Sequence, residues 1–550
     1  MKRFLVIAFS ISLLVGHALS QNTSVNHATS FAVSLALNDL AKLPSLPSES
    51  REMGESEHRI LVPGVGLKGL IDPVEQKGTK AGASTVTVSS FAGIAHTGMY
   101  PPDTTMAVGD TQILQWVNTS YTVCQKIAPF TCGPIIRGNL LWSALGGPCA
   151  SNNGGDITAQ WDVAAHRWLL AQNVYVAPYA VCVAVSTSAD ATGTYYLYQF
   201  PTVNNAEADY AKWGIWSTAY FQSYNSLYGS CGIECGVACA YNSAKLLAGD
   251  KTAEQICHAY TSTDAGLLPA DVDSPTPPPA GQDEFYIGGL SPYDTAHLSL
   301  YSVHINNQSD WSQGATFTGG GNSQLISIAP FLPPCSSVGQ YGGDCVPQKG
   351  VSDLLASLMT LMYRFAYWND GSGQHWLVNF DATASGGNIG PRWMEITAPN
   401  TPVTVSGLTV YQQGTYAPDG NWRWMGSIAR DKAGDILLGY SESCGNTCPG
   451  GTPMYPSIYV AGRQPSDPLG TLGSEVNVIS GGGAQTGSSR RWGDYSTMRI
   501  DQDGCTFWYT QEYYTVTNSN FWSTQIASIT FPSCSGIVPP TQLTATVSGS

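Results

Sequence analysis

Charged residues recur at the start of segments that we expect to be the innermost strands of a repeated β-fold. Most of these charged residues are carboxylates in the first half of the chain and arginines in the last part. Planar guanidinium groups suit bidentate capture of a carboxylate or sulfate. Opposed carboxylates suit sugar hydroxyls, a cation or general acid–base chemistry. These positions are Asp103, Asp156, Asp209 with Lys212, Asp283 with Glu284, Arg364, Arg423, and Arg491 with Asp494.

We predict that these side chains converge at the mouth of an axial channel and bind a ligand there. The catalytic residues stay undetermined. A structural role stays open for each arginine, because a residue that recurs from blade to blade can tie neighbouring blades together. The predicted ligand-binding residues are Arg364, Arg423, Arg491, Asp103, Asp156, Asp209 and Lys212. The catalytic candidates are Asp103, Asp209, Asp494, Glu512 and Tyr495.

Tyr495 and Glu512 lie close in sequence to the Arg491 segment. A tyrosine–glutamate pair would be the nucleophile arrangement of a sialidase-type site. Both residues are explained equally well as ordinary strand residues, and the two interpretations stay open.

The elements that position these residues are predicted from a repeat. Residues 423–440 and 491–509 each read as strand, tight turn and strand, and each begins with arginine and tryptophan. A supersecondary unit repeated at long period indicates a repeat architecture. Similar hairpins begin near residues 106, 159, 213, 285 and 365, and a second strand pair lies between successive hairpins.

Two hairpins make a four-stranded antiparallel sheet, which is one propeller blade. We therefore predict an all-β fold, a seven-bladed β-propeller with six to eight blades as the range. Residues 85–88 alternate like a strand and are free to close the ring. The range reflects residues 241–283, which are irregular and contain a run of prolines.

The ends of the chain differ from this repeat. Residues 1–20 combine a basic start, an apolar run and a small-residue cleavage site, which is typical of a secretory signal peptide. Residues 21–84 are expected to be a largely irregular propeptide or surface arm, and 85–534 to be the propeller. Residues 535–550 read as a linker or the start of a truncated fibronectin-III or Ig-like module. The protein is predicted to be secreted, at the cell surface or in the periplasm.

Composition narrows the class of partner. Charged residues form 11% of the chain, and the formal net charge is −15, whereas an average soluble domain is roughly 25% charged. Negative charge repels phosphate backbones and anionic membrane surfaces. We expect no nucleic-acid partner and no membrane insertion. A monomer that binds a glycan or another cell-surface polymer is predicted.

The 14 cysteines indicate disulfides in an exported chain. Cys231, Cys235, Cys239 and Cys257 with His258 also have a metal-like spacing, but oxidation removes the thiolates that zinc requires. No cofactor is expected, and a structural calcium ion at Asp501-Gln502-Asp503 is kept as an alternative. The predicted disulfide partners are Cys124 with Cys132, Cys335 with Cys345, Cys444 with Cys448, and Cys505 with Cys534.

Several motifs resemble those of large secreted bacterial β-propeller proteins, which often continue into fibronectin-III or Ig-like modules and mostly have no assigned function. The resemblance covers about residues 90–534. This chain has Trp368-Asn369-Asp370-Gly371 where that family commonly carries an arginine-containing turn. The motifs are Pro101-Pro102-Asp103-Thr104, Leu361-Met362-Tyr363-Arg364, Arg392-Trp393-Met394-Glu395, Tyr411-Gln412-Gln413-Gly414-Thr415-Tyr416, Arg423-Trp424-Met425-Gly426-Ser427 and Arg491-Trp492-Gly493-Asp494-Tyr495-Ser496.

The chain also resembles, more distantly, the sialidase-like propeller superfamily. It lacks that superfamily's Asp-box pattern, of which only Gly314-x-Thr316-Phe317 is kept. Three functions follow as hypotheses. The first is a secreted propeller that binds a glycan or cell-surface polymer at its axial mouth. The second is a sialidase-like exo-glycoside hydrolase or lyase that acts on a carboxylated sugar. The third is a structural or adhesive surface protein.

Overall fold

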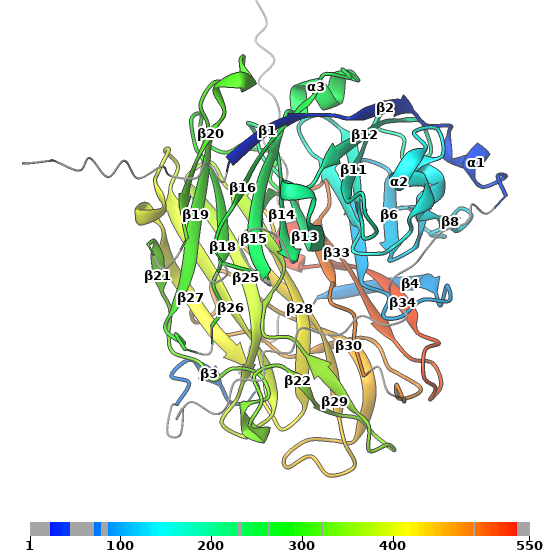
Figure 1. Cartoon of the computed structure of the whole chain (residues 1–550). Coiled ribbons are helices and arrows are strands. Elements are labelled where there is room, and N and C mark those ends of the chain that lie inside the picture. Colours follow the sequence, from blue (N-terminus) through cyan, green and yellow to red (C-terminus); the bar gives the residue numbers. More distant parts are fainter. Residues whose placement is uncertain are drawn as a thin grey trace, which may run out of the picture.

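The computed structural model describes residues 23–44, 71–78, 86–227, 234–261, 264–291, 293–320, 323–487 and 490–535. Strands predominate in these residues, and the helices are short. Figure 1 shows sheets that follow one another around the molecule in chain order. Within the described ranges, every helix is too short or too polar to cross a lipid bilayer.

Three antiparallel sheets come first along the chain. In each, consecutive strands pair with one another, so the first strand lies at one edge. The first sheet contains β5 (Thr104–Val108), β6 (Gln112–Val117), β7 (Ser120–Gln125) and β8 (Ile136–Arg137). The second contains β9 (Thr158–Asp162), β10 (Arg167–Val174), β11 (Ala180–Ser186) and β12 (Tyr195–Pro201). The third contains β13 (Glu207–Ile215), β14 (Tyr220–Leu227), β15 (Glu234–Tyr241) and β16 (Glu254–Ala259).

The next two groups of strands join edge to edge, because β17 pairs in parallel with β24. The first group contains β17 (Leu268–Val272), β18 (Glu284–Gly288), β19 (His297–Ile305), β20 (Ala315–Gly319) and β21 (Leu325–Ser327). The second contains β24 (Leu361–Asn369), β25 (Gly373–Thr383), β26 (Ile389–Pro399) and β27 (Thr409–Tyr416). A separate hairpin between them consists of β22 (Gly343–Pro347) and β23 (Leu354–Ser357).

The last sheet joins the two ends of the repeat. Its outermost strand, β4 (Thr87–Ala95), precedes all the other strands of the repeat in sequence and pairs with β34. The strand predicted near residues 85–88 is thus found in the closing position, but it extends to Ala95. The sixth sheet contains β28 (Trp422–Arg430), β29 (Ile436–Cys444), β30 (Met454–Arg463) and β31 (Val476–Ile479). The last contains β32 (Thr497–Ile500), β33 (Thr506–Tyr513), β34 (Ser523–Thr530) and β4.

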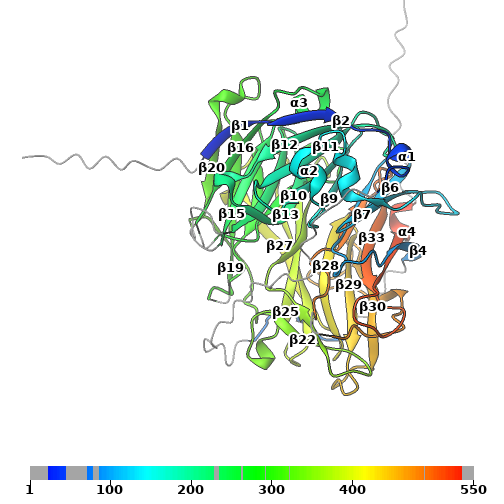
Figure 2. The ribbon, with the colours of Figure 1, turned by 45° about the vertical axis from the view of Figure 1, so that its right-hand side comes forward.

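The first strands of these groups contact one another in a closed cycle, from β5 through β9, β13, β17, β24, β28 and β32 back to β5. Each group therefore turns its first strand toward a common axis and its last strand outward, which is the arrangement of a β-propeller. The predicted all-β propeller fold is confirmed. Figure 2 shows the same succession of sheets from a second direction.

The N-terminal segment adds strands to the outside of the propeller. β1 (Thr23–His27) pairs with β16, and β2 (Ser30–Val33) pairs with β12. β3 (Glu75–Gln76) pairs in parallel with β27. Thus two stretches of the segment that we expected to be largely irregular form regular strands and cover exposed sheet edges. The predicted signal peptide and residues 536–550 lie outside the described residues.

Short helices connect the strands. The α-helices are α1 (Leu37–Leu40), α2 (Gly147–Ser151), α3 (Ser243–Ala248) and α4 (Pro532–Ser535). The 3-10 helices are η1 (Gly138–Trp142), η2 (Val203–Asn205), η3 (Trp311–Gln313), η4 (Ser336–Val338) and η5 (Val405–Gly407).

Two of the predicted inner strands are in a different place. The hairpin at 285–301 is formed by β18 and β19, and the first strand of that group is β17, within the segment that we interpreted as irregular. Residues 491–496 precede β32 and form a loop. Their backbone N–H groups at Gly493 and Asp494 donate to carboxylates rather than to a neighbouring strand.

Six disulfides lie within the described residues, and four of them are the pairs that the spacing predicts. Cys235 is disulfide-bonded as well, so neither it nor the Cys239–Cys257 pair offers a thiolate for zinc. Disulfides in this number fit an oxidising extracellular environment. The bonds are Cys124–Cys132, Cys149–Cys182, Cys239–Cys257, Cys335–Cys345, Cys444–Cys448 and Cys505–Cys534.

Aromatic side chains fill the space between neighbouring sheets. Trp376 on β25, for example, packs against Phe285 on β18 with ring centroids 5.8 Å apart. Close approach near the axis depends on a small residue. A Cβ at Gly214 on β13 would lie 2.1 Å from the carbonyl oxygen of Ala270 on β17. A glycine is therefore required for these two first strands to pack together.

Candidate ligand-binding site

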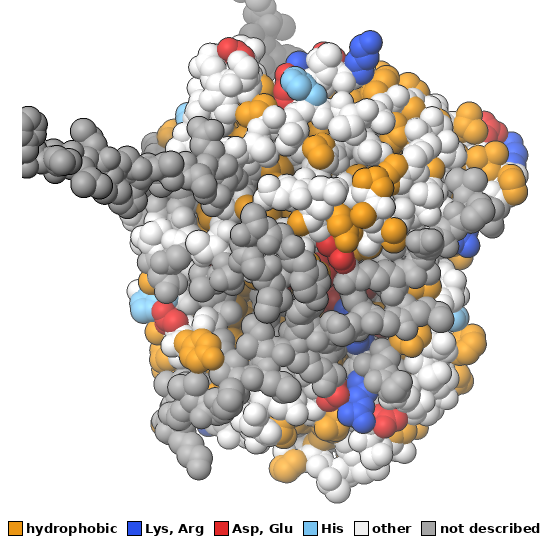
Figure 3. All heavy atoms as spheres, viewed as in Figure 1, with side chains coloured by type: hydrophobic (Ala, Val, Ile, Leu, Met, Phe, Trp, Pro, Cys, Tyr) orange, Lys and Arg blue, Asp and Glu red, His pale blue; other side chains and the backbone are white. Residues whose placement is uncertain are grey.

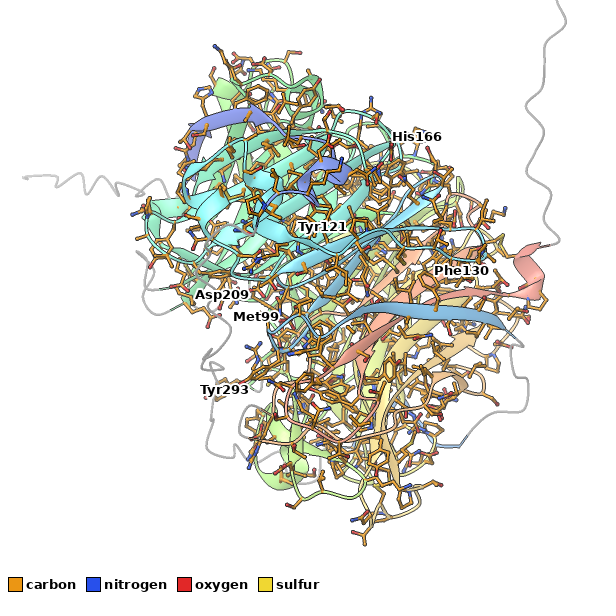
Figure 4. The ribbon with its side chains drawn as sticks, turned by 90° about the vertical axis from the view of Figure 1, so that its right-hand side faces the viewer. Met99, Tyr121, Phe130, His166, Asp209 and Tyr293 are labelled. Carbon is orange, nitrogen blue, oxygen red and sulfur yellow. A yellow bond between two sulfur atoms is a disulfide. The ribbon has the colours of Figure 1, made fainter. Side chains whose placement is uncertain are left out.

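Charged and aromatic side chains meet at one end of the propeller axis, where β5, β9, β13 and β32 begin. Figure 3 shows acidic and basic side chains together near the middle of the face that Figure 1 presents. Asp209, at the edge of this group, is labelled at the left side of Figure 4. We call the following residues the mouth cluster: Asp103, Asp156, Tyr210, Lys212, Arg491, Asp494, Tyr495 and Glu512.

Hydrogen bonds tie the loops before three first strands into this cluster. The backbone N–H of Asp494 donates to Asp103 Oδ1 at 2.5 Å. Asn118 connects two sheets, because its Nδ2 donates to Asp103 Oδ2 at 2.9 Å and its Oδ1 accepts the N–H of Asp156 at 3.3 Å. Arg491 forms an ion pair with Asp494. Carboxylates that precede β5, β9 and β32 are thus held in one network.

β13 brings a buried ammonium group to the same place. Lys212 is 0% exposed, and its Nζ donates to the carbonyl oxygen of Tyr210 at 3.0 Å. The ammonium lies against the Tyr210 ring and 4.8 Å from the ring centroid of Tyr495. Cations are attracted to aromatic faces in this arrangement. A register shift between Asp209 and Lys212 makes it possible, because a β-bulge turns side chains out of the regular alternation.

The backbone around the mouth cluster is strained. Asp103, Asn118, Asp156 and Tyr210 have φ values of 43°, 36°, 48° and 53°, in the left-handed region that is unfavourable for residues other than glycine. Such a conformation costs about 1–3 kcal/mol per residue, and the surrounding contacts must hold it in place.

Burial dominates the electrostatics of the carboxyl groups. It raises the pKa of Asp103 from 3.8 to about 6, while Arg491 opposes the rise and Asp156 adds to it. Burial also raises the pKa of Glu512 well above its ordinary value, and the charge of Asp103 adds to this effect. The pKa of Lys212 is lowered by burial against the opposing attraction of Asp156 and Asp494. The cluster therefore holds carboxyl groups that keep their protons more readily than exposed ones.

A second group of charges lies along the axis next to the mouth cluster, and the ring of Tyr363 connects the two, 6.0 Å from that of Tyr495. In this group, Arg364 donates from Nε to Asp271 Oδ2 at 2.8 Å and from Nη1 to Asp273 Oδ2 at 2.6 Å. We call the following residues the hub cluster: Gln160, Asp271, Asp273, Tyr363, Arg364 and Arg499.

Arg499 in β32 connects several sheets at once. Its guanidinium group donates to Asp271 on β17, to Gln160 on β9 and, at 2.9 Å, to the hydroxyl of Tyr363 on β24. It also donates to the carbonyl oxygen of Met106 on β5 at 3.3 Å. The two arginines lower the pKa of Asp271 despite its burial. The hub cluster ties first strands together and satisfies its own charges.

Arg423 belongs to a third group, within its own sheet and the loops beside it. Its guanidinium group contacts Glu475 at 2.5 Å, Asp419 at 2.8 Å and Glu442 at 3.1 Å. These three carboxylates are the group in the described residues that could also hold a metal ion. The guanidinium group already supplies a positive charge to all three. We call these four residues the Arg423 cluster.

Most of the residues predicted from the sequence for one mouth do meet there. Asp209 lies at the edge, half-buried, and acts electrostatically on Lys212. Arg364 and Arg423 do not join them, so the three predicted arginines contact three separate sets of carboxylates. Asp283 and Glu284 do not join them either: Asp283 pairs with His304 at 2.7 Å, and Glu284 lies on β18, which is not the first strand of its group. The predicted residues in the mouth cluster are Asp103, Asp156, Lys212, Arg491, Asp494, Tyr495 and Glu512.

Tyr495 and Glu512 do not form the pair that would suit a sialidase-type nucleophile. The Tyr495 hydroxyl donates to the carbonyl oxygen of Ala211 at 2.9 Å. Glu512 Oε1 accepts the N–H of Gly493 at 3.0 Å. Both residues nevertheless face the mouth cluster.

Sequence reasoning missed Tyr210 and Asn118, together with Asp271 and Arg499 of the hub. Asp271 lies in a strand that the nearby prolines obscured. Arg499 alternates with Met498 and Ile500, so a charged residue on the inner face of an apolar strand was an available signal. Asn118 begins an Asn-x-Ser sequon, yet its amide is 1% exposed and is bonded to Asp103.

The predicted calcium position at 501–503 is a turn. Asp501 pairs with Lys126 at 2.7 Å, and Asp503 Oδ1 accepts the backbone N–H groups of Cys505 and Thr506. These contacts already satisfy both carboxylates. Within the described ranges, the one acidic group close enough for a cation is that of the Arg423 cluster.

Several solved structures resemble the chain weakly. The α-L-arabinofuranosidase Arb93A from Fusarium graminearum is 9% identical over 58% of this chain and 92% of that chain, with a TM-score of 0.28. The BP39L lectin from Burkholderia pseudomallei is 11% identical over 80% and 97%, with a TM-score of 0.30. Zg3597, a family 117 glycoside hydrolase from Zobellia galactanivorans, is 11% identical over 82% and 91%, with a TM-score of 0.25.

No protein-family model matches the sequence, and no curated protein matches it significantly. The similarity to secreted bacterial propellers and to the sialidase-like superfamily therefore stays a resemblance. The function has to be argued from the residues of the mouth cluster.

Proposed function

We propose that this protein binds a glycan or another hydroxyl-rich cell-surface polymer at the mouth cluster. The observation that carries the proposal is the mixture of groups gathered there. Carboxylates from Asp103 and Asp156 accept hydrogen bonds, Lys212 and Arg491 donate them, and the Tyr210 ring offers an aromatic face. Sugar recognition uses these three kinds of contact, since sugar hydroxyls donate and accept while ring faces are apolar.

The distribution of strain supports a binding role. Four left-handed residues other than glycine converge on this one group, and strained backbone clusters at ligand sites because a fixed geometry favours recognition. Tyr210 is half-buried, and the side chains of Arg491 and Asp494 are 10% and 12% exposed, so these three residues form the accessible edge of the cluster. The hub cluster has no comparable edge, because Arg364 and Asp271 are each 1% exposed.

Hydrolysis of a glycosidic bond is a second candidate, favoured by the raised pKa of Asp103. A carboxyl group with a pKa of about 6 suits a general acid near neutral pH. A sialidase-like grip on a carboxylated sugar is disfavoured, because Arg364 and Arg423 have other partners. A structural or adhesive role would instead leave the mouth cluster without a ligand.

A glycan-array screen combined with fluorogenic glycosides tests both candidates on the mature protein. Binding should weaken in Asp494→Asn and Arg491→Ala. Arg490→Ala is the matched control, because Arg490 is adjacent in sequence but pairs with Asp344 at 3.1 Å. Turnover that Asp103→Asn abolishes would favour the hydrolase. Equal binding by all variants would show that the mouth cluster is not the site.

A further inference from the structure

We infer that the mouth cluster recognises a protonated amine, so that glycans containing amino sugars bind more tightly than their N-acetylated or carboxylated counterparts. This inference rests on the binding function proposed above and specifies its ligand. The first argument is an excess of carboxyl groups in the mouth cluster. Asp103, Asp156, Asp494 and Glu512 face only two basic side chains, and Asp209 adds another carboxylate at the edge.

The two basic groups are already shared. Arg491 pairs with Asp494 and also acts on Asp103. Lys212 is attracted by Asp156, Asp494, Asp209 and Asp103 together. Neither cation belongs to a single carboxylate, so the cluster can accept a further positive charge, whereas a sugar carboxylate would meet repulsion.

Glu512 provides an independent sign of a missing donor. It is 1% exposed, and its Oε2 has no hydrogen-bond partner among the described residues. The charges of Asp103 and Asp494 act on it, which places it against the acidic part of the cluster. A buried polar atom without a hydrogen-bond partner costs about 1–3 kcal/mol. Once Glu512 has released its proton, an ammonium N–H from a ligand would remove this cost.

Lys212 shows that the site accommodates the amino group of an alkyl chain. Its Nζ has a carbonyl acceptor at Tyr210 and lies against two tyrosine rings. The carboxylates of the cluster act on it electrostatically. Amines are recognised by this combination of carboxylate and aromatic face. A ligand amine next to Lys212 would find the same chemistry at Glu512 and Asp103.

A metal ion fits the mouth cluster less well than an amine does. A divalent cation needs several carboxylate oxygens close together. Within the described residues, a set of three such atoms within 4.8 Å of one another is found in the Arg423 cluster and not in the mouth cluster.

Binding of the amine should depend on pH. Below a pH of about 6, Asp103 takes up a proton and its attraction for a cation is lost. Burial raises the pKa of Glu512, so binding of the amine should favour release of its proton. The groups that face these two carboxyls are Asp156, Asp494, Arg491, Lys212, Tyr210 and Tyr495.

Isothermal titration calorimetry at pH 6.5 with glucosamine, N-acetylglucosamine and glucuronate oligomers tests the inference. The glucosamine oligomer should bind roughly tenfold or more tighter than the other two, the effect expected for a hydrogen bond to a charged group. The measured heat should change with the ionisation enthalpy of the buffer, because a proton is released. At pH 5 the preference should shrink.

Variants connect this preference to the residues. Glu512→Gln should abolish the preference and the proton release, and Asp494→Asn should weaken the preference. Circular dichroism checks that both are folded. Arg490→Ala should keep the preference unchanged. Calcium chloride alone, titrated into the protein, should give the same heat for the wild type and for the Glu512→Gln variant.

The outcomes separate this inference from the proposed function. Equal binding of amine and N-acetylated oligomers, a preference for the glucuronate oligomer, or calcium binding at Glu512 would overturn the amine inference and leave glycan binding intact. Failure to bind any glycan would overturn the proposed function, and the amine inference with it.

Discussion

The hub cluster and the mouth cluster are built from similar residue types, and they differ in how their charges are satisfied. The hub residues lie mainly on the innermost strands, and the mouth residues lie mainly in the loops that precede them. In the hub, Arg364 and Arg499 share Asp271, and Arg364 also pairs with Asp273. In the mouth, carboxyl groups outnumber basic ones and Glu512 Oε2 has no donor among the described residues. Recurrence of charge near the axis therefore does not distinguish scaffold from site. The number of carboxyl groups relative to basic groups in each cluster does.

Removing Arg499 should have the largest effect on stability, because it breaks the hub cluster. Arg499→Met leaves Asp271 with one counter-charge fewer and Gln160 without its donor. Loss of one partner from a buried ion pair costs about 3–5 kcal/mol. Chemical denaturation should show a loss near the top of this range, and glycan binding per folded molecule should be unchanged. A loss below about 1 kcal/mol would contradict a scaffold role.

Arg423→Met should destabilise the protein slightly less, by about 3 kcal/mol, because the buried Glu442 loses its counter-charge. Asp419→Asn is the matched control. The Asp419 side chain is 41% exposed, so its loss should cost no more than about 1 kcal/mol. Thermal unfolding of both variants measures the difference. Loss of glycan binding in a folded Arg423→Met protein would place this arginine in the binding site after all.

The two clusters should respond to pH with opposite sign. The pKa of Asp103 is raised from 3.8 to about 6, so its contribution to stability falls as pH rises through that interval. Asp103→Asn should therefore gain up to about 3 kcal/mol over the wild type between pH 4 and pH 7. The pKa of Asp271 is lowered, so its contribution is present at neutral pH and is lost as pH falls.

Asp271→Asn should accordingly be most destabilising at pH 7 and least at pH 3. Free energies of unfolding for both variants across this range provide the test. Parallel profiles for the two variants would remove the electrostatic distinction between hub and mouth.

The smallest effect on stability is expected for Glu512→Gln, under about 1 kcal/mol, because burial already raises the pKa of this carboxyl group and the amide is neutral and of similar shape. Binding of a glycan should nevertheless weaken roughly tenfold. Denaturation and calorimetry on the same preparation measure both quantities. A large loss of stability without loss of binding would assign Glu512 to the scaffold.

Much of the fold was predictable from the sequence because it depends on local patterns. Alternating strands and Asp-Gly turns, as at Asp503-Gly504, mark hairpins wherever they occur. Closely spaced cysteines such as Cys124 and Cys132 have few alternative partners. β17 was missed because prolines follow it, and the loop at 491–496 was interpreted as a strand because Trp492 resembled its counterpart Trp424.

The sequence by itself determined that charged residues would stand near the propeller axis, because the position of a residue at the start of a hairpin is a local property. Only the tertiary structure decided which charges meet. Asp271 and Arg499 are 228 residues apart in the chain, yet they are hydrogen-bonded. Their contact depends on how the sheets are arranged around the ring, and so does the separation of Arg364, Arg423 and Arg491. Contacts between strands that are distant in sequence form only when the ring of sheets closes, so no local sequence pattern predicts them.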